Sequence, residues 1–413
     1  MKKETIEQKY DHLLASAKSQ RRYDFSNTDR VYAVFVHTLY ELKLDPFDDI
    51  GIVERAIEDW LKYIVDKNPA KASFGDFNAH LNTNLAINRH QHFLVFPLVD
   101  SGCAVDIVGE TFQIITGDPG QKIAKLTSLC GISIGEANSF AEHTEQNKAP
   151  GFFDHNLLVV PQQAHTSAVR FRATELMRLV LYVIRMFYLG YSRGLDIDTT
   201  PRFRISSLSA SKLGRSPSDT IAIWADEYHS FAHLSLHSPV SMSFDLDFIV
   251  RSLGEIDSFI RNIVLNINRN DFGERILNAV VLGNKAYQLE KQREPNLSLL
   301  VLLSTIESLL CENRNEKKLR LAALLPRFAG VEPTEVSKRA RELAILYDSR
   351  NQFVHAAEQQ NIDLLLGKES VAPLVLVSRL LARLIFSNVD VTNQTTLRDW
   401  NERVNDAFEG LVF

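Results

Sequence analysis

The residues of this sequence that could do chemistry near neutral pH lie together at positions 347–355, in the run Tyr-Asp-Ser-Arg-Asn-Gln-Phe-Val-His. Arg350 can hold a phosphate through two parallel hydrogen bonds and keeps its charge near neutral pH. His355 can give or take a proton in that range, and Asn351 can orient a water molecule, a base edge or the histidine ring. A phosphate grip and a proton donor without a metal ligand indicate metal-free cleavage of RNA, in which the 2′-hydroxyl is the nucleophile.

The spacing of these residues predicts that a single chain contributes only part of an active site. His355 follows Arg350 by five positions, which is about 140° round an ideal helix. Asn351 and His355 are four positions apart and share a helix face. Two copies related by a two-fold axis would bring both motifs to one cleft. We therefore expect a homodimer through the C-terminal helices. Some of the apolar residues of one late helix would line the interface, from the set Val371, Leu374, Val375, Leu381, Leu384 and Ile385.

The arginine-to-histidine spacing has little specificity by itself. A second match runs from Arg30 to His37, but the residues between them are mostly apolar, so we interpret that run as a structural segment. At Arg350 a polar residue follows the arginine directly. The plain alternative for the later motif is a solvated helix face whose histidine is held by a neighbour.

The later motif resembles the HEPN superfamily, which is marked by Arg, a polar residue, a short spacer and His. It is most similar to the Apea-type HEPN domains of bacterial defence proteins. In those domains a Tyr-x-x-Arg-x-x-x-x-His run follows a helix that carries a glutamate. Tyr347, Arg350 and His355 match the run, Glu307 stands on the preceding apolar helix, and the likeness covers roughly residues 270–390.

The resemblance implies a helical bundle, dimerisation and metal-independent endoribonuclease activity. Ala356 stands after the histidine, where the family frequently has glycine. Some members of the family are inactive scaffolds. The resemblance therefore leaves two functions open, a nuclease and a non-catalytic binding module.

Two supporting residues have alternative interpretations. Glu307 must be paired or neutralised if it is buried, either by Arg350 or His355 or by an ordinary salt bridge at the edge of its helix. For Tyr347 we favour a core position over a hydroxyl near the phosphate. A local basic cluster precedes the motif and could contact RNA phosphates, or it could be a solvated face balanced by glutamates: Arg314, Lys317, Lys318, Arg320, Arg327, Lys338, Arg339 and Arg341.

The elements that must position the motif fall into three parts. Residues 1–85 have helical periodicity. Residues 86–245 mix short β-prone runs with helical ones and form an α/β region. Residues 246–413 return to a 3.6-residue period, and their helices follow one another with short joins. The expected fold class is α+β, an N-terminal mixed α/β region followed by a C-terminal all-α, HEPN-like helical bundle.

Composition limits the function classes. The chain has 413 residues, 45% of them hydrophobic and 23% charged, as in soluble globular proteins of two or three domains. Its net charge of −5 excludes a globally basic nucleic-acid binder, so any RNA contact must use a local patch. Three widely separated cysteines, with no secretory signal and no membrane-spanning run, favour a cytoplasmic protein.

Other reaction classes have little support. His229, His233 and His237 repeat every four residues and on a helix could bind zinc, but a strand or loop fits that segment about as well. The sequence has no Gly-rich phosphate-binding loop and no Gly-x-Ser-x-Gly elbow. We therefore expect no metal ion and no cofactor.

These observations predict a metal-independent endoribonuclease that acts as the effector of a bacterial defence system of the abortive-infection or toxin type. Its Arg/His site would be shared across a dimer, and its substrate would be RNA. The N-terminal region would sense a phage-derived trigger, or bind a regulatory partner that restrains the nuclease. The alternative is a non-catalytic HEPN scaffold that binds RNA or a protein partner.

Overall fold

The computed structural model divides the chain into two compact units. The first comprises Met1–Pro97, Asp118–Glu175 and Ser211–His237, and the second comprises Leu98–Gly117, Leu176–Ala210 and Ser238–Phe413. The expected boundaries near residues 85 and 245 stay predictions. The residues whose structure is described are 4–25, 29–41, 50–67, 72–98, 105–147, 149–191, 220–225, 230–235, 252–266, 269–311, 316–356, 373–390 and 394–412.

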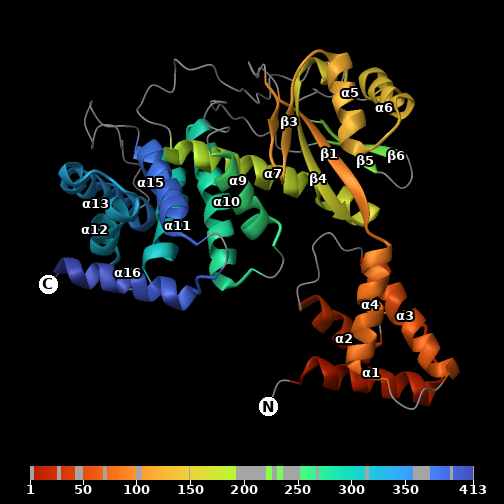
Figure 1. Ribbon diagram of the computed structural model, residues 1–413. Coiled ribbons are helices and arrows are strands. Elements are labelled where there is room, and N and C mark those ends of the chain that lie inside the picture. The colour runs from red at the N-terminus through yellow and green to blue at the C-terminus, as the bar shows by residue number, and fades with distance from the viewer. Residues whose placement is uncertain are drawn as a thin grey trace. The chain divides into compact units, whose positions relative to one another are not determined.

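Four helices at the start of the first unit pack around one aromatic core (Figure 1). Tyr10 lies at its centre, where its ring stacks on that of Phe77 and its hydroxyl accepts a 2.9 Å hydrogen bond from the indole of Trp60. Capping boxes begin the first and fourth helices, so their first backbone N–H groups have partners. The helices are α1 (Ile6–Gln20), α2 (Arg30–Glu41), α3 (Ile50–Lys67) and α4 (Phe74–Ile87).

The first unit also contains a sheet with strand order β4-β1-β5-β6. Strand β1 runs antiparallel to β5, with Leu94 opposite Ile223, and β5 runs antiparallel to β6. Residues 93–98 of β1 are all buried, so both faces of this strand are covered. The elements are β1 (His90–Leu98), α5 (Pro119–Cys130), α6 (Ile134–Asn147), the short η1 (Phe152–Asp154), β4 (Asn156–Ala164), β5 (Thr220–Ala225) and β6 (Ser230–Ser235).

His233 lies on strand β6, where residues four positions apart do not have the spacing of a helix face. The zinc site that we considered on a helix is therefore wrong at this position. His229 and His237 lie outside the described residues.

The second unit begins with a hairpin that is hydrogen-bonded to a helix far along the chain. Strands β2 (Ile107–Val108) and β3 (Gln113–Ile115) pair antiparallel. The buried carboxylate of Asp257, on α9 (Leu253–Phe259), accepts hydrogen bonds from the backbone N–H groups of Glu110 and Thr111 at 2.9 and 3.0 Å, and from the Thr111 hydroxyl. A π-helical turn (Ile260–Val264) follows α9, so the 3.6-residue period that we expected beyond residue 246 is interrupted here.

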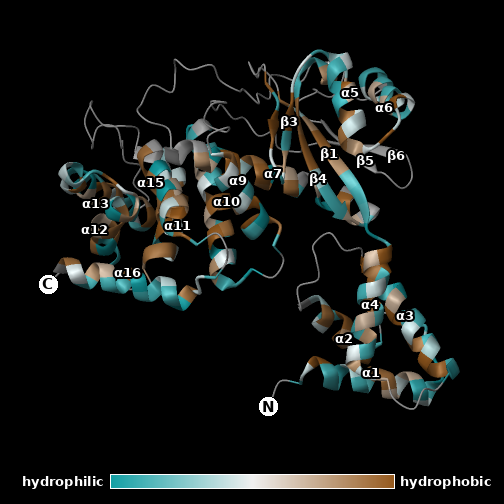
Figure 2. Ribbon diagram, in the orientation of Figure 1, coloured by the Kyte–Doolittle hydropathy of each residue, from teal (hydrophilic) through white to brown (hydrophobic). Residues whose placement is uncertain are grey.

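Six further helices form a bundle within the described residues of the second unit. Helix α10 packs on α11 and α15, and α12 packs on α13, α15 and α16 (Figure 1). In Figure 2, α16 is largely hydrophilic along its visible side, but the indole of Trp400 is buried and donates a 2.7 Å hydrogen bond to the carbonyl oxygen of Leu309. The helices are α10 (Asp271–Lys291), α11 (Pro295–Leu310), α12 (Lys317–Phe328), α13 (Pro333–Ala356), α15 (Pro373–Asn388) and α16 (Leu397–Val412); α7 (Thr166–Tyr191) belongs partly to each unit.

Helices predominate in the described residues, and the described strands all precede residue 236, in agreement with the α+β class. The expectation that apolar residues of α15 line a dimer interface is wrong for three of them. Leu381, Leu384 and Ile385 are fully buried within the chain itself, because α15 packs against α10, α11 and α12. These three residues are therefore not available to a dimer interface. Val371 and the side chains of Leu374 and Val375 lie outside the described part of the structure.

Candidate functional site

Helix α13 carries the three residues of the motif but presents them in different directions. Leu343, Leu346 and Tyr347 are buried on one face of this helix. At about 100° per residue, the direction of Arg350 falls in the middle of that buried face. The arginine therefore points towards the inside of the bundle, with 17% of its side chain exposed.

Glu307 of α11 meets Arg350 inside the bundle, together with a second cation. Its Oε1 atom lies 3.6 Å from Nη2 of Arg350, and its Oε2 atom accepts a 2.8 Å hydrogen bond from Nζ of Lys317, the first residue of α12. Only 8% of the glutamate side chain is exposed. A carboxylate this deeply buried needs a counter-charge, and the structure supplies two.

The other neighbours of Arg350 come from its own helix. Its Nη1 atom donates a 2.9 Å hydrogen bond to Oδ1 of Asn351, and its guanidinium carbon lies 5.6 Å from the centre of the Tyr347 ring. Burial, and then the charge and hydrogen bonding of Glu307, raise the pKa of Tyr347 to about 12. The tyrosine is thus uncharged near neutral pH and lies in the core beside the site, as we expected.

Cys311 also borders this group, although the sequence showed it only as an isolated cysteine. Burial, followed by the negative charge of Glu307, raises the pKa of its thiol to about 11. The thiol therefore stays protonated near neutral pH and is no activated nucleophile. Lys317 had appeared only as one member of the basic cluster. Its pairing with Glu307 joins residues ten positions apart on two helices, a contact for which helical periodicity gives no signal.

His355 is placed differently from Arg350. It is exposed, one residue before the end of α13, and no hydrogen bond joins its ring to Arg350 within the described residues. Asn351 is half-buried between the two. One chain therefore brings Arg350, Asn351, Glu307 and Tyr347 together, but leaves the proton-transfer group on a separate side of the helix.

Several members of the expected basic cluster have carboxylate partners. Nζ of Lys318 lies 2.5 Å from Asp348, and Arg339 pairs with Glu335 and Glu342 at 2.9 and 2.8 Å. These pairs reduce the positive charge that α12 and α13 present to solvent. They support the alternative interpretation for these positions, a solvated face with balanced charges.

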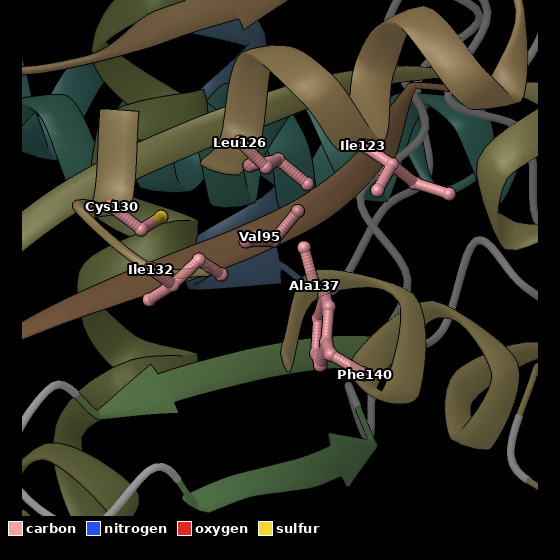
Figure 3. A pocket seen from close by; sticks show the side chains of 7 residues that line it. All are labelled: Val95, Ile123, Leu126, Cys130, Ile132, Ala137 and Phe140. Atoms are coloured by element: carbon pink, nitrogen blue, oxygen red, sulfur yellow. The ribbon is translucent and has the colours of Figure 1, made fainter. Parts of the chain in front are cut away.

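A small cavity lies in the first unit. It is lined by α5, α6, the segment between them and β1, and its walls are apolar (Figure 3). No charged side chain lines it, so it lacks the polar groups that orient a ligand. Its lining residues are Val95, Ile123, Leu126, Cys130, Ile132, Ala137 and Phe140. Nor do three or more histidine, cysteine or acidic side chains gather as a metal site anywhere in the described ranges.

Comparison with known proteins identifies no relative. No family model matches the chain, and no curated protein or solved structure is similar to it. None of the helices within the described ranges is both long and apolar enough to span a membrane. The resemblance to HEPN domains therefore rests on the sequence motif and stays a prediction.

Proposed function

We propose that the C-terminal helices form a metal-independent endoribonuclease of the HEPN type, acting as the effector of a bacterial defence system. One observation carries the proposal. An arginine that never loses its charge is held inside a helical bundle by Glu307 and Asn351, and about one and a half turns later the same helix presents an exposed histidine. These are the two groups that RNA cleavage without a metal requires.

In the proposed reaction the 2′-hydroxyl attacks the adjacent phosphorus and the bond to the 5′-oxygen breaks. The products are a 2′,3′-cyclic phosphate and a 5′-hydroxyl end. Arg350 stabilises the negative charge that builds on the non-bridging phosphate oxygens. His355 takes the proton from the 2′-hydroxyl or gives one to the leaving 5′-oxygen.

A second copy of the chain would bring a histidine to the phosphate that Arg350 of the first copy holds. Because Arg350 and His355 leave α13 in directions about 140° apart, a phosphate held by one arginine is poorly placed for the histidine of the same chain. In a two-fold dimer the two histidines can divide the roles of base and acid between them. In this proposal the first unit binds a phage-derived trigger or a regulatory partner that restrains the nuclease.

The same geometry also favours a second function, a non-catalytic scaffold that binds RNA or a protein. Glu307 already gives Arg350 a counter-charge, and His355 makes no hydrogen bond to the arginine. An arginine that only stabilises its bundle would have these contacts. The two functions differ in whether RNA is cut.

The deciding experiment is incubation of the purified protein with total RNA in the presence of EDTA, followed by analysis of the ends. The nuclease predicts 2′,3′-cyclic phosphates or their opened products, and no cutting of an all-deoxy substrate. His355→Ala and Arg350→Ala should each lower the cleavage rate at least ~100-fold. His37→Ala, in a second arginine–histidine segment on α2, is the matched control and should cut normally. Full activity of His355→Ala would refute the proposed mechanism.

A further inference from the structure

The charges around Glu307 do not balance. Lys317 and Arg350 bring two positive charges to a single carboxylate. Tyr347 and Cys311 border the same group, but their raised pKa values of about 12 and about 11 keep both of them neutral. Counted over the described residues, the group formed by Glu307, Lys317 and Arg350, here called the two-cation cluster, therefore holds one surplus positive charge in a partly buried place.

The cations of this cluster also keep unused hydrogen-bond donors. Nζ of Lys317 carries three N–H groups, and within the described residues its one hydrogen bond goes to Glu307. One third of this side chain is exposed. Nη2 of Arg350 lies 3.6 Å from Oε1 of Glu307, which is too long for a strong hydrogen bond. An incoming anion can therefore gain donors from both cations without breaking a short bond.

The contacts of Glu307 show that both cations can contact one anion at the same time, each at a different oxygen. Its Oε1 atom faces Arg350 and its Oε2 atom faces Lys317. A phosphodiester also presents two non-bridging oxygens on one atom and carries a single negative charge, which equals the surplus of the cluster. The neighbouring Lys318 differs, because its ammonium group is already neutralised by Asp348 at 2.5 Å.

We propose that Lys317 is a second phosphate-binding residue of the site, which contacts the same RNA phosphodiester as Arg350. The inference rests on the proposed function, since it concerns the way in which that site holds RNA. Glu307 then acts as the spacer that keeps the two cations apart and pointed at a common place. Phosphate contacts give RNA affinity without sequence preference, so Lys317 adds to affinity for every sequence alike.

The test measures binding separately from cleavage. A fluorescent single-stranded 2′-O-methyl RNA has no free 2′-hydroxyl and cannot be cut by the proposed route, so fluorescence anisotropy over a series of KCl concentrations reports binding alone. Loss of one phosphate contact to a single strand lowers the slope of log K against log[salt] by roughly 0.7. Lys317→Gln should show this change and bind about tenfold more weakly. Lys317→Arg, which keeps the charge, should retain the wild-type slope.

Lys318→Gln is the matched control, since it removes the adjacent lysine of the same helix and should leave both slope and affinity unchanged. If Lys317→Gln unfolds, the double variant Lys317→Gln/Glu307→Gln leaves no carboxylate to balance and should show the same lower slope. Wild-type slopes in all the Lys317 variants, with an active wild-type enzyme, would overturn the inference and leave the proposed function standing. A wild-type protein that neither binds nor cuts RNA would overturn both.

Discussion

Gly109→Ala should destabilise the second unit, because the added methyl group has no room. A Cβ atom at this position would lie 2.7 Å from Oδ2 and 3.0 Å from Oδ1 of Asp257, and 2.8 Å from the carbonyl oxygen of Phe112. Neither neighbour can easily withdraw. The carboxylate is held by hydrogen bonds from Glu110 and Thr111, and the Phe112 carbonyl accepts a 3.0 Å hydrogen bond from the N–H of Gly109 itself.

The size of the effect follows from two opposing terms. Forcing extra atoms into a packed site costs about 1–3 kcal/mol, whereas replacing glycine by alanine restricts the unfolded chain and returns about 0.4–1 kcal/mol. The net loss in the free energy of unfolding should be roughly 1–2 kcal/mol. Hydrogen–deuterium exchange of a peptide that covers residues 105–117 measures it locally. A loss of about 1.4 kcal/mol would accelerate exchange there about tenfold.

Gly254→Ala is the matched control on the helix that carries Asp257. A Cβ atom there meets nothing within 4 Å, so the same substitution should stabilise the protein by up to about 1 kcal/mol. A lower free energy of unfolding in Gly109→Ala and a higher one in Gly254→Ala would support the close approach of Asp257 to the hairpin. Equal exchange of residues 105–117 in Gly109→Ala and in the wild type would refute it.

Three further predictions concern the motif. Arg350→Lys should lower the cleavage rate at least about tenfold, because a lysine has no forked donor to hold both a phosphate and Asn351; wild-type rates would show that charge alone suffices. Tyr347 should make the fold sensitive to alkali, because its pKa is raised to about 12 in the folded chain. Its contribution to the free energy of unfolding is intact below pH 10 and decreases by about 1.4 kcal/mol per pH unit from pH 10 to about 12. Urea titrations should find this decrease in the wild type and not in Tyr347→Phe. Mixing Arg350→Ala chains with His355→Ala chains should restore part of the activity if the site is shared, and an active monomer would exclude a shared site.

The regular elements could be predicted because their signals are local. The 3.6-residue period predicted helices beyond residue 246. In the structure, Pro295 is the first residue of α11, and Gly330 follows the end of α12 with a positive φ of 67°. The period failed near residue 260, where the N–H of Leu265 bonds to the carbonyl oxygen of Ile260 and the helix widens to a π turn. Nothing in the pattern of apolar residues distinguishes that turn from a continuing α-helix.

The surroundings of the motif could be predicted only in part. The position of Tyr347 on an apolar face predicted its burial, and the cost of burying a charge predicted a partner for Glu307. That Lys317 is the stronger partner depends on how α12 packs beside α11 and α13. The hydrogen bond from the Thr111 N–H to Asp257 joins residues 146 positions apart. Contacts of this kind depend on tertiary packing, which periodicity does not report.

The position of Arg350 within its helix decides where any chemistry must occur. At 1.5 Å rise per residue and a backbone radius of about 2.3 Å, the Cα atoms of Arg350 and His355 lie roughly 9 Å apart, with side chains that diverge. Arg350 is turned inward on Glu307, and the partly exposed side chain of Lys317, at the start of α12, contacts the same glutamate. A histidine that serves a phosphate held by Arg350 must approach from outside the chain. In the proposed nuclease, the contact of Arg350 with Glu307 therefore favours a site that is completed by a second copy.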